Sequence, residues 1–263
     1  MSTYTHGHHE SVLRSHRWRT AANSAAYLLP HLTSDQRLLD VGCGPGTLTL
    51  DLATRVGSVT ALEQNDGALN LARGEAARQN AADVSFEIGD VHALSFPDDS
   101  FDVVHAHQVL QHVADPVQAL REMRRIARPG GIVAVRDSDY PAFGWFPKLP
   151  ELDDWMALYL RCARANGGEP EAGRRLLSWA QAAGFTAITP TASVWCFATP
   201  EDRAWWGGMW ADRILESAMA TQALDAGYAS QGDLQAISDG YRRWAEAPDG
   251  WMSILHGEIV ARV

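Results

Sequence analysis

The architecture of this chain is set by Leu38-Leu39-Asp40-Val41-Gly42-Cys43-Gly44-Pro45-Gly46-Thr47. An apolar run ends in an acid, three glycines follow at alternate positions, and an amphipathic segment begins. This order predicts a buried strand, a tight turn and a helix start. Glycines are needed where the backbone turns sharply against a ligand, because a Cβ would collide with it. The G-x-G-x-G spacing differs from the nicotinamide-binding G-x-G-x-x-G, and no P-loop G-K-[ST] follows. We therefore expect a nucleoside-binding turn that need not cradle a phosphate.

The composition restricts the partners and the compartment. Acidic residues outnumber basic ones, 32 to 22, and the net charge is −10 over 263 residues. A surface of that sign repels phosphate backbones, so we expect no nucleic-acid partner. Cys43, Cys162 and Cys196 have no C-x-x-C spacing, which favours reduced thiols in a cytoplasmic protein. No apolar stretch is long enough to span a membrane, and the polar N-terminus does not look like a signal peptide.

Short strands and helices alternate through the first half of the chain. Strands are predicted at 36–41, 58–62, 83–88, 101–106 and 132–136, and helices at 10–30, 46–55, 66–80 and 116–127. The stretch Arg128-Pro129-Gly130-Gly131 is expected to separate the last helix from the fifth strand. This alternation predicts a parallel, doubly wound sheet. Beyond it we expect helices at 150–166, 170–183 and 200–247, and strands at 185–199 and 251–260.

The strand ends carry the candidate ligands, because open α/β sheets bind ligands at the carboxyl ends of their strands. Glu63 closes the second predicted strand, about 20 residues after the glycine turn. There an acceptor-only carboxylate can receive both hydroxyls of a ribose. Plainer structural alternatives are a solvated loop acid for Glu63, a turn cap for Asp40 and a turn former for Asp90.

Three segments resemble one enzyme family, in the same order along the chain. Asp40–Gly46 resembles the first motif of class I S-adenosylmethionine-dependent methyltransferases, in the form common in their ubiquinone/menaquinone-biosynthesis-like branch. Gly89–Phe96 resembles the family's G-D-A-x-x-L-P-F segment, and Asp102–Val113 its fourth-strand segment. The resemblance implies an α/β, Rossmann-like, doubly wound seven-stranded sheet with an antiparallel last strand. It also implies S-adenosyl-L-methionine as cofactor and methyl transfer to a small molecule.

The resemblance further implies a role for each candidate ligand. The glycines, with Cys43 as a small turn residue, pack against the methionine and adenosyl portions, and Asp40 lies near the cofactor ammonium. Glu63 binds the ribose. Asp90 accepts from the adenine amine, while the N–H of Val91 donates to a ring nitrogen. The implied cofactor-binding residues are Asp40, Gly42, Cys43, Gly44, Gly46, Glu63, Gln64, Asp90, Val91 and His107.

Methyl transfer from a sulfonium is an in-line displacement, so a general base is useful but not obligatory. Histidine is the natural base near neutral pH, and we expect His107, then His6 and His8, in this role. In relatives the N-terminal segment folds over the active site, and Tyr4–Arg14 resembles that lid. The plain alternative is a flexible tail. His6 and His8 could chelate a metal together with Glu10, but methyl transfer needs none, so we expect no metal.

Tryptophan is abundant, with ten in the chain. Trp195, Trp206 and Trp210 fall in or beside the second-half helices, and Trp145 follows the fifth strand. We expect them, with Tyr4, to line the acceptor site, which favours a flat aromatic acceptor. The alternative is core packing. Relatives with this kind of N-terminus include indole C3 methyltransferases, so an indole-like carbon is our first expectation.

We also expect the acceptor to be neutral. Basic side chains that could bind a carboxylate or a phosphate are sparse near these rings, and Arg203 and Arg213 are the exceptions. Alternatives are a noncatalytic S-adenosylmethionine-binding scaffold and a methyltransferase of a non-aromatic lipid, quinone or sugar. An RNA or protein substrate is disfavoured by the charge and by the lack of an Asn/Asp-Pro-Pro-aromatic motif after the fourth strand. We expect one domain, monomeric or homodimeric, over 1–263: a lid helix at 1–30, a cofactor-binding core at 36–137 and a helical substrate-side insertion at 200–250.

Overall fold

The computed structural model describes residues 10–263. Its helices are α1 (Glu10–Arg17), α2 (Ala21–Ser24), α3 (Thr47–Ala53), α4 (Asp66–Gln79), α5 (Pro116–Ile126), α6 (Pro150–Ala165), α7 (Ala172–Ala182), α8 (Pro200–Glu216), α9 (Ala218–Asp225) and α10 (Gln231–Glu246). Its strands are β1 (Arg37–Val41), β2 (Ser58–Glu63), β3 (Val84–Ile88), β4 (Phe101–His107), β5 (Ala127–Ser138), β6 (Gly144–Phe146), β7 (Ala187–Phe197) and β8 (Trp251–Arg262). Single 3-10 turns are η1 (Leu29–His31), η2 (Leu110–His112) and η3 (Tyr140–Ala142).

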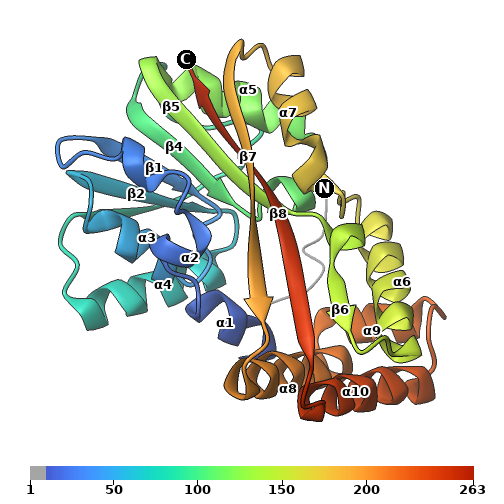
Figure 1. The fold of residues 1–263 in the computed structure, drawn as a ribbon. Helices are drawn as coiled ribbons and strands as arrows, with labels where there is room; N and C mark the ends of the chain where they lie inside the picture. Colours follow the sequence, from blue (N-terminus) through green and yellow to red (C-terminus); the bar gives the residue numbers. More distant parts are fainter. Residues whose placement is uncertain (1–9) are drawn as a thin grey trace.

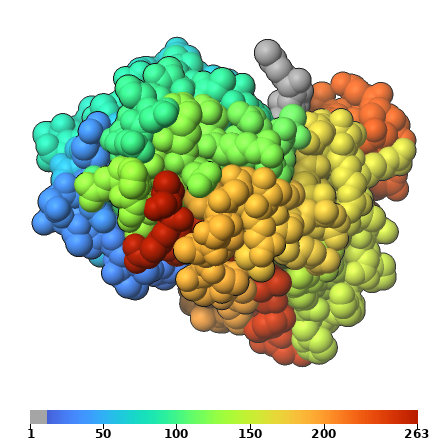
Figure 2. Space-filling model, turned by 90° about the horizontal axis from the view of Figure 1, so that it is seen from above, coloured from blue at the N-terminus to red at the C-terminus, as the bar shows by residue number. Residues whose placement is uncertain are grey.

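The strands form one mixed sheet in the order β3-β2-β1-β4-β5-β8-β6, with β7 paired to β8 (Figure 1). Strands β1 to β5 are parallel, and β8 runs antiparallel to β5, β6 and β7. The predicted α/β fold with an antiparallel last strand is therefore confirmed. The sheet has an eighth strand, the three-residue β6, because β8 extends past the end of β5 and pairs there with Gly144–Phe146. Figure 2 shows the red end of β8 between the green β5 region and the orange β7 region.

Alternate residues of the central strands pack against different helices, as strand geometry requires. Leu38 and Val103 share one core with α3 and the segment around α2. Their neighbours Leu39 and Val104 share the opposite core with α5 and α7. Both faces of the central sheet are thus covered, which explains why β4 is buried along its whole length.

A third core lies at the far end of β6, β7 and β8, where α6, α8, α9 and α10 gather (Figure 1). It is rich in aromatic rings: Trp155 lies 4.8 Å from Trp210 and 5.5 Å from Tyr241, measured between ring centroids. The helical stretch predicted at 200–247 is confirmed as three helices, of which α8 and α10 pack together.

The single helix predicted at 10–30 is wrong. The chain forms α1, then α2, then η1, because Thr20 starts a new helix with a capping box. Its side chain accepts from the N–H of Asn23, and the Asn23 side chain accepts from the N–H of Thr20. A non-helical bend at Trp18-Arg19 results, which turns Arg19 toward the sheet.

The expected break after α5 is also shorter than predicted. Helix α5 ends at Ile126, and β5 already begins at Ala127. The Arg128–Gly131 stretch lies within β5, where the N–H of Gly130 donates to the carbonyl of Val263. Among residues 10–263, no helix is both long and apolar enough to cross a bilayer.

Candidate functional site

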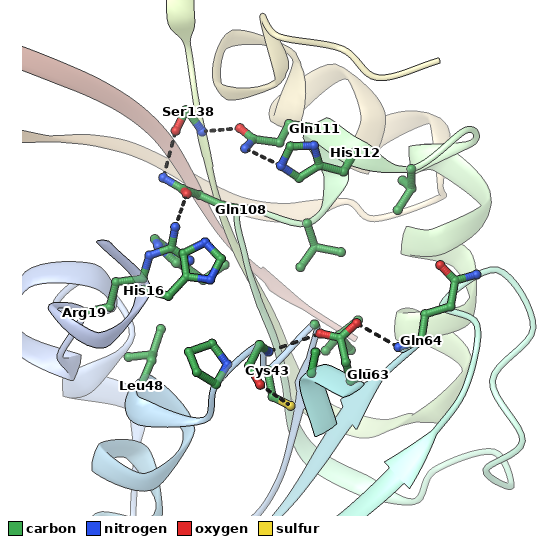
Figure 3. Close-up of a pocket in the computed structure, with 18 of the residues that line it drawn as sticks. His16, Arg19, Cys43, Leu48, Glu63, Gln64, Gln108, Gln111, His112 and Ser138 are labelled. Atoms are coloured by element: carbon green, nitrogen blue, oxygen red, sulfur yellow. Dashed lines mark hydrogen bonds between the residues drawn. The ribbon is translucent and has the colours of Figure 1, made fainter. Parts of the chain in front are cut away.

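A cavity of about 640 Å³ lies at the carboxyl ends of β1, β2 and β4, within the size range of small-molecule sites (Figure 3). The glycine turn forms its floor. Gly42, Gly44 and Gly46 all have positive φ, of 71°, 54° and 83°. A Cβ on Gly42 would lie 2.5 Å from the Val109 side chain, so only glycine fits there.

Gly44 faces the cavity, and the nearest atom to a Cβ there would be Nδ1 of His16, at 3.6 Å. A side chain at this position would therefore occupy ligand space. Gly46 lies outside the lining and caps α3 instead, where a Cβ would lie 2.9 Å from that of Ala72. Cys43 lines the cavity, but its thiol is not a candidate nucleophile. Burial, then the carboxylates of Asp40 and Glu63, raises the pKa of the Cys43 thiol.

Asp40 is buried at the end of β1 and has two partners inside the chain. Its Oδ2 accepts from the Thr49 hydroxyl at 2.5 Å, and its Oδ1 lies 2.7 Å from Nδ1 of His105. Asp40 also lines the cavity. The carboxylate thus joins β1 to β4 and α3 directly before the glycine turn.

Glu63 ends β2 beside the turn, where the sequence predicts a ribose ligand. Its Oε2 accepts from the N–H of Gly44 at 3.1 Å, and its Oε1 from the N–H of Gln64 at 2.9 Å (Figure 3). Glu63 and Gln64 both line the cavity. Each oxygen has a second lone pair, so these bonds leave the carboxylate able to accept from a ligand hydroxyl.

Asp90 and Val91 follow β3 on the same cavity rim. Oδ1 of Asp90 accepts from the N–H of His92 at 2.9 Å and lies 2.6 Å from Nδ1 of His92. The backbone bond from His92, followed by its side chain, lowers the pKa of the Asp90 carboxyl. Asp90 therefore forms a turn and also presents a carboxylate to the cavity, so the two interpretations of this residue are compatible.

A polar wall faces the glycine turn across the cavity, and the sequence interpretation missed most of it. Nη2 of Arg19 donates to Oε1 of Gln108 at 2.5 Å, and Nε2 of Gln108 donates to the Ser138 hydroxyl at 2.9 Å. The Ser138 N–H donates to Gln111, whose side chain contacts His112 (Figure 3). Gln108 has a φ of 56°, an uncommon conformation for this residue type. Such strain is concentrated at functional sites.

His107 is the catalytic candidate that the structure places in the cavity. Its ring is buried, 5.8 Å from Trp195 and 6.3 Å from His256 between centroids. Neither ring nitrogen has a hydrogen-bond partner in the described part of the chain. Its neighbour in register on β5 is Arg136. Burial, then the Arg19 and Arg136 guanidinium groups, lowers the pKa of His107 well below its usual value.

Aromatic rings line the end of the cavity beyond His107. Trp195, Trp206 and Trp210 lie there, together with Tyr140 and Phe143 of the β5–β6 connection, and their role as acceptor ligands stays a prediction. Trp145 does not line the cavity. Its indole packs into the helical core 6.4 Å from Trp155, and Lys148 lies over its ring.

The remaining expected site residues, Tyr4, His6 and His8, lie outside the described residues. Among residues 10–263, no group of three or more histidine, cysteine or acidic side chains is placed to hold a metal ion.

Comparison with known proteins now identifies the family. A family model described as a methyltransferase domain matches residues 32–184. An uncharacterized methyltransferase of Schizosaccharomyces pombe is 36% identical, over 98% of this chain and 95% of the relative. The chain belongs to the methyltransferase domain family. It is a class I enzyme that uses S-adenosylmethionine, as its glycine turn and strand-end acids imply.

Two further comparisons agree with this assignment. A probable methyltransferase of Aspergillus luteorubrus is 29% identical to this methyltransferase, over 99% of this chain and 97% of the relative. Phosphoethanolamine N-methyltransferase 2 of Haemonchus contortus, solved with phosphomonomethylethanolamine and S-adenosylhomocysteine, shares the fold. It is 19% identical with a TM-score of 0.57, over 90% of this chain and 52% of that one.

Proposed function

We propose that this methyltransferase binds S-adenosylmethionine over the glycine turn and methylates a small, ring-containing acceptor held in the aromatic end of the same cavity. The observation that carries the proposal is the continuity of the cavity. It runs from Glu63 and Asp90 at one end, past Gly44 and His107, to Trp206 and Trp210 at the other. A donor and an acceptor can therefore meet without leaving the protein.

The donor end suits an adenosyl ligand in shape and in chemistry. Gly44 leaves room for it, Glu63 can accept from the ribose hydroxyls, and Asp90 can accept from the adenine amine. Val91 is buried beside Asp90, which places its backbone at the same rim. Asp40 supports the turn through Thr49 and His105 rather than reaching far into the cavity.

Bound S-adenosylmethionine supplies an electrophilic methyl group, and the chain's own residues orient the acceptor and exclude water. His107 stands between the two ends with a neutral, buried imidazole. Its imidazole can accept a hydrogen bond from the substrate and take up the substrate's proton transiently. Because the pKa of His107 is low, the imidazole releases that proton again near neutral pH. As candidates for a general base, the tail histidines His6 and His8 rank after His107.

The acceptor is proposed to be aromatic, with an indole-like carbon as the first candidate. Trp195, Trp206 and Trp210 line this end together with Tyr140 and Phe143, and such rings stack on flat substrates. A quinone-like acceptor is the second candidate. A demethylmenaquinone methyltransferase of Renibacterium salmoninarum is 35% identical over 52% of this chain. We further propose one domain, with the segment before Thr20 as a lid and 200–250 on the substrate side. The rest of the predicted lid, residues 21–30, packs against the sheet through Ala21, Ala25 and Leu28 instead.

Calorimetry with S-adenosylhomocysteine tests the donor end directly. Glu63→Ala should weaken binding about tenfold to a hundredfold, because charge-assisted hydrogen bonds contribute about 1.5–3 kcal/mol. The matched control is Glu87→Ala, which removes an exposed acid of β3 outside the cavity lining and should leave affinity unchanged. Equal affinity of the Glu63 variant and the wild type would remove Glu63 from the site.

A further inference from the structure

The two ends of the cavity differ in charge. Its lining carboxylates, Asp40, Glu63, Asp90 and Asp115, stand on the donor end, at or after strands β1 to β4. We call the other end the acceptor half, and define it by Arg19, Tyr140, Trp195, Trp206, Trp210 and Arg213. The two arginines among the described lining residues both lie against rings of this half, Arg19 near Trp195 and Arg213 near Trp210. Two arginines at one end of a cavity, away from its carboxylates, are unusual in a chain of net charge −10.

Arg19 is held in the wall by an amide whose orientation the surrounding contacts determine. Nδ1 of His256 lies 3.1 Å from the carbonyl of Ile254, so Nδ1 carries the proton and Nε2 accepts. Nε2 of Gln108, 2.8 Å away, must then donate to it, as it also does to the Ser138 hydroxyl. The Gln108 oxygen therefore points toward Arg19 and fixes its guanidinium at the cavity surface (Figure 3).

Arg213 brings a second guanidinium from α8. It is only 4% exposed, its Nη2 donates to the Ser15 hydroxyl at 2.8 Å, and its guanidinium carbon lies 4.6 Å from the Trp210 ring centre. Arg19 likewise lies 6.0 Å from the Trp195 ring centre. Among rings that exclude water, a fixed cation acts more strongly than it would at the surface.

The pKa shifts of titratable groups around this half agree with positive charge nearby. Burial, followed by Arg19, lowers the pKa of His112 to about 3. Burial, followed by Arg136 and Arg19, lowers the pKa of His256 well below its usual value. A side-chain hydrogen bond with Tyr159, then Arg213 and Arg19, oppose the burial that raises the pKa of Tyr140. With His107 neutral as well, these three imidazoles carry no charge, and Arg19 and Arg213 are the cations among the described residues that line the cavity.

We propose that the acceptor is a flat aromatic carboxylate, bound as an anion against Arg19, with its ring among Trp195, Trp206 and Trp210. This inference rests on the proposed function and replaces the expectation of a neutral acceptor. Guanidinium groups match carboxylates in geometry and charge. Arg203, which the sequence placed near the acceptor, is buried outside the lining and donates to the carbonyls of Ala198 and Ala245.

The test compares two probes of nearly equal shape, 2-naphthoate and the neutral 2-naphthalenemethanol, by calorimetry on protein saturated with S-adenosylhomocysteine. Wild type should bind the acid about tenfold tighter or more. Arg19→Gln should abolish that preference while changing alcohol affinity little, and Arg19→Lys should retain part of it. The control is Arg242→Gln, which removes an exposed cation paired with Asp212 outside the cavity and should keep the preference.

Equal affinity for both probes, or binding of neither, would overturn the proposal, as would an equal loss of both in Arg19→Gln. Thermal unfolding checks that Arg19→Gln is folded, and Gln108→Leu, which removes the guanidinium anchor, is the second variant if it is not. Affinity for S-adenosylhomocysteine is measured separately. A defective donor site would show as a loss of affinity for S-adenosylhomocysteine. The preference for the acid can still be measured in the absence of S-adenosylhomocysteine, so the two failures are distinguishable.

Discussion

Nδ1 of His105 on β4 lies 2.7 Å from Oδ1 of Asp40 on β1, and both side chains are buried. A carboxylate can only accept, so His105 donates from Nδ1. The Thr49 hydroxyl donates to the other oxygen. One acid therefore joins the two central strands to the helix that follows the turn.

Asp40→Asn should destabilise the fold, because an amide cannot accept at both ends. One of the two donors then loses its partner in a buried site, which costs about 1–3 kcal/mol of unfolding free energy. Thr49→Val, which removes a single hydrogen bond, should cost less. Urea unfolding measures both variants. An Asp40→Asn protein as stable as wild type would mean that the carboxylate serves a bound ligand and not the turn.

Two variants of Asp90 should show whether this residue binds adenine or only forms a turn. Asp90→Asn keeps an oxygen that can accept, so it should weaken S-adenosylhomocysteine binding less than Asp90→Ala, which should lose about tenfold. Asp83→Asn, directly before β3 and outside the cavity lining, is the control. Identical losses in the two Asp90 variants, with circular dichroism unchanged, would leave Asp90 only its turn with His92.

The donor end was predictable from sequence because its residues are local to strand ends. Apolar runs place Asp40, Glu63 and Asp90 at the ends of β1, β2 and β3, and parallel strands bring those ends together. The structure puts all three at one cavity, although what they bind is still a prediction. The sheet followed from the same periodicity, except for β6, which is too short to show any.

The polar wall was not predictable in this way. Arg19 and Gln108 meet across 89 positions, and their contact depends on the bend after α1 and on the left-handed backbone of Gln108. The bend had only a weak sequence signal: Thr20 is a favoured N-cap residue, but Asn23 stands where the capping-box motif has Glu or Gln. The positive φ at a glutamine has no sequence signal. Composition likewise could not separate Trp145, which lies only in the helical core, from Trp210, which belongs to the same core and also lines the cavity.

Gln108→Leu should impair the acceptor end and spare the donor end. It removes the hydrogen bonds to Arg19, Ser138 and His256. We expect a KM for the acceptor raised about tenfold, with S-adenosylhomocysteine affinity within about twofold of wild type. Gln64→Leu, at the opposite rim, should do the reverse. Steady-state kinetics and calorimetry give the two readouts. Loss of both affinities in both variants would contradict a cavity with separable ends.

Deletion of residues 1–9 tests the proposed lid. Turnover should fall at least about a hundredfold, because desolvation and alignment of the acceptor depend on closure. The thermal unfolding midpoint should change little, since the sheet and the described hydrophobic cores are built from later residues. His6→Ala and His8→Ala in the full chain show whether these histidines act as bases or whether the segment only covers the active site. A truncated enzyme with full activity would dismiss the lid.

Stability should fall as the pH drops below about 6.5. His107, His112 and His256 have lowered pKa values in the fold, so below that pH the unfolded chain binds protons that the native state does not. Burial acts oppositely on Asp137, raising its pKa to about 7. Between roughly pH 4 and 7, the native state therefore binds one proton that the unfolded chain does not. Three histidines against one carboxyl leave a net loss of about 2.7 kcal/mol per pH unit near pH 5.

Urea unfolding at several pH values between about 7.5 and 5 measures this slope, and two variants test its composition. His112→Gln removes one of the three histidine titrations, so its stability should fall less steeply with acid, whatever its stability at neutral pH. Asp137→Asn removes the opposing carboxyl and should make the fall steeper. Both slopes should change by about 1.4 kcal/mol per pH unit, in opposite directions. A stability independent of pH over this range would mean that water reaches these imidazoles and lets them protonate in the native state.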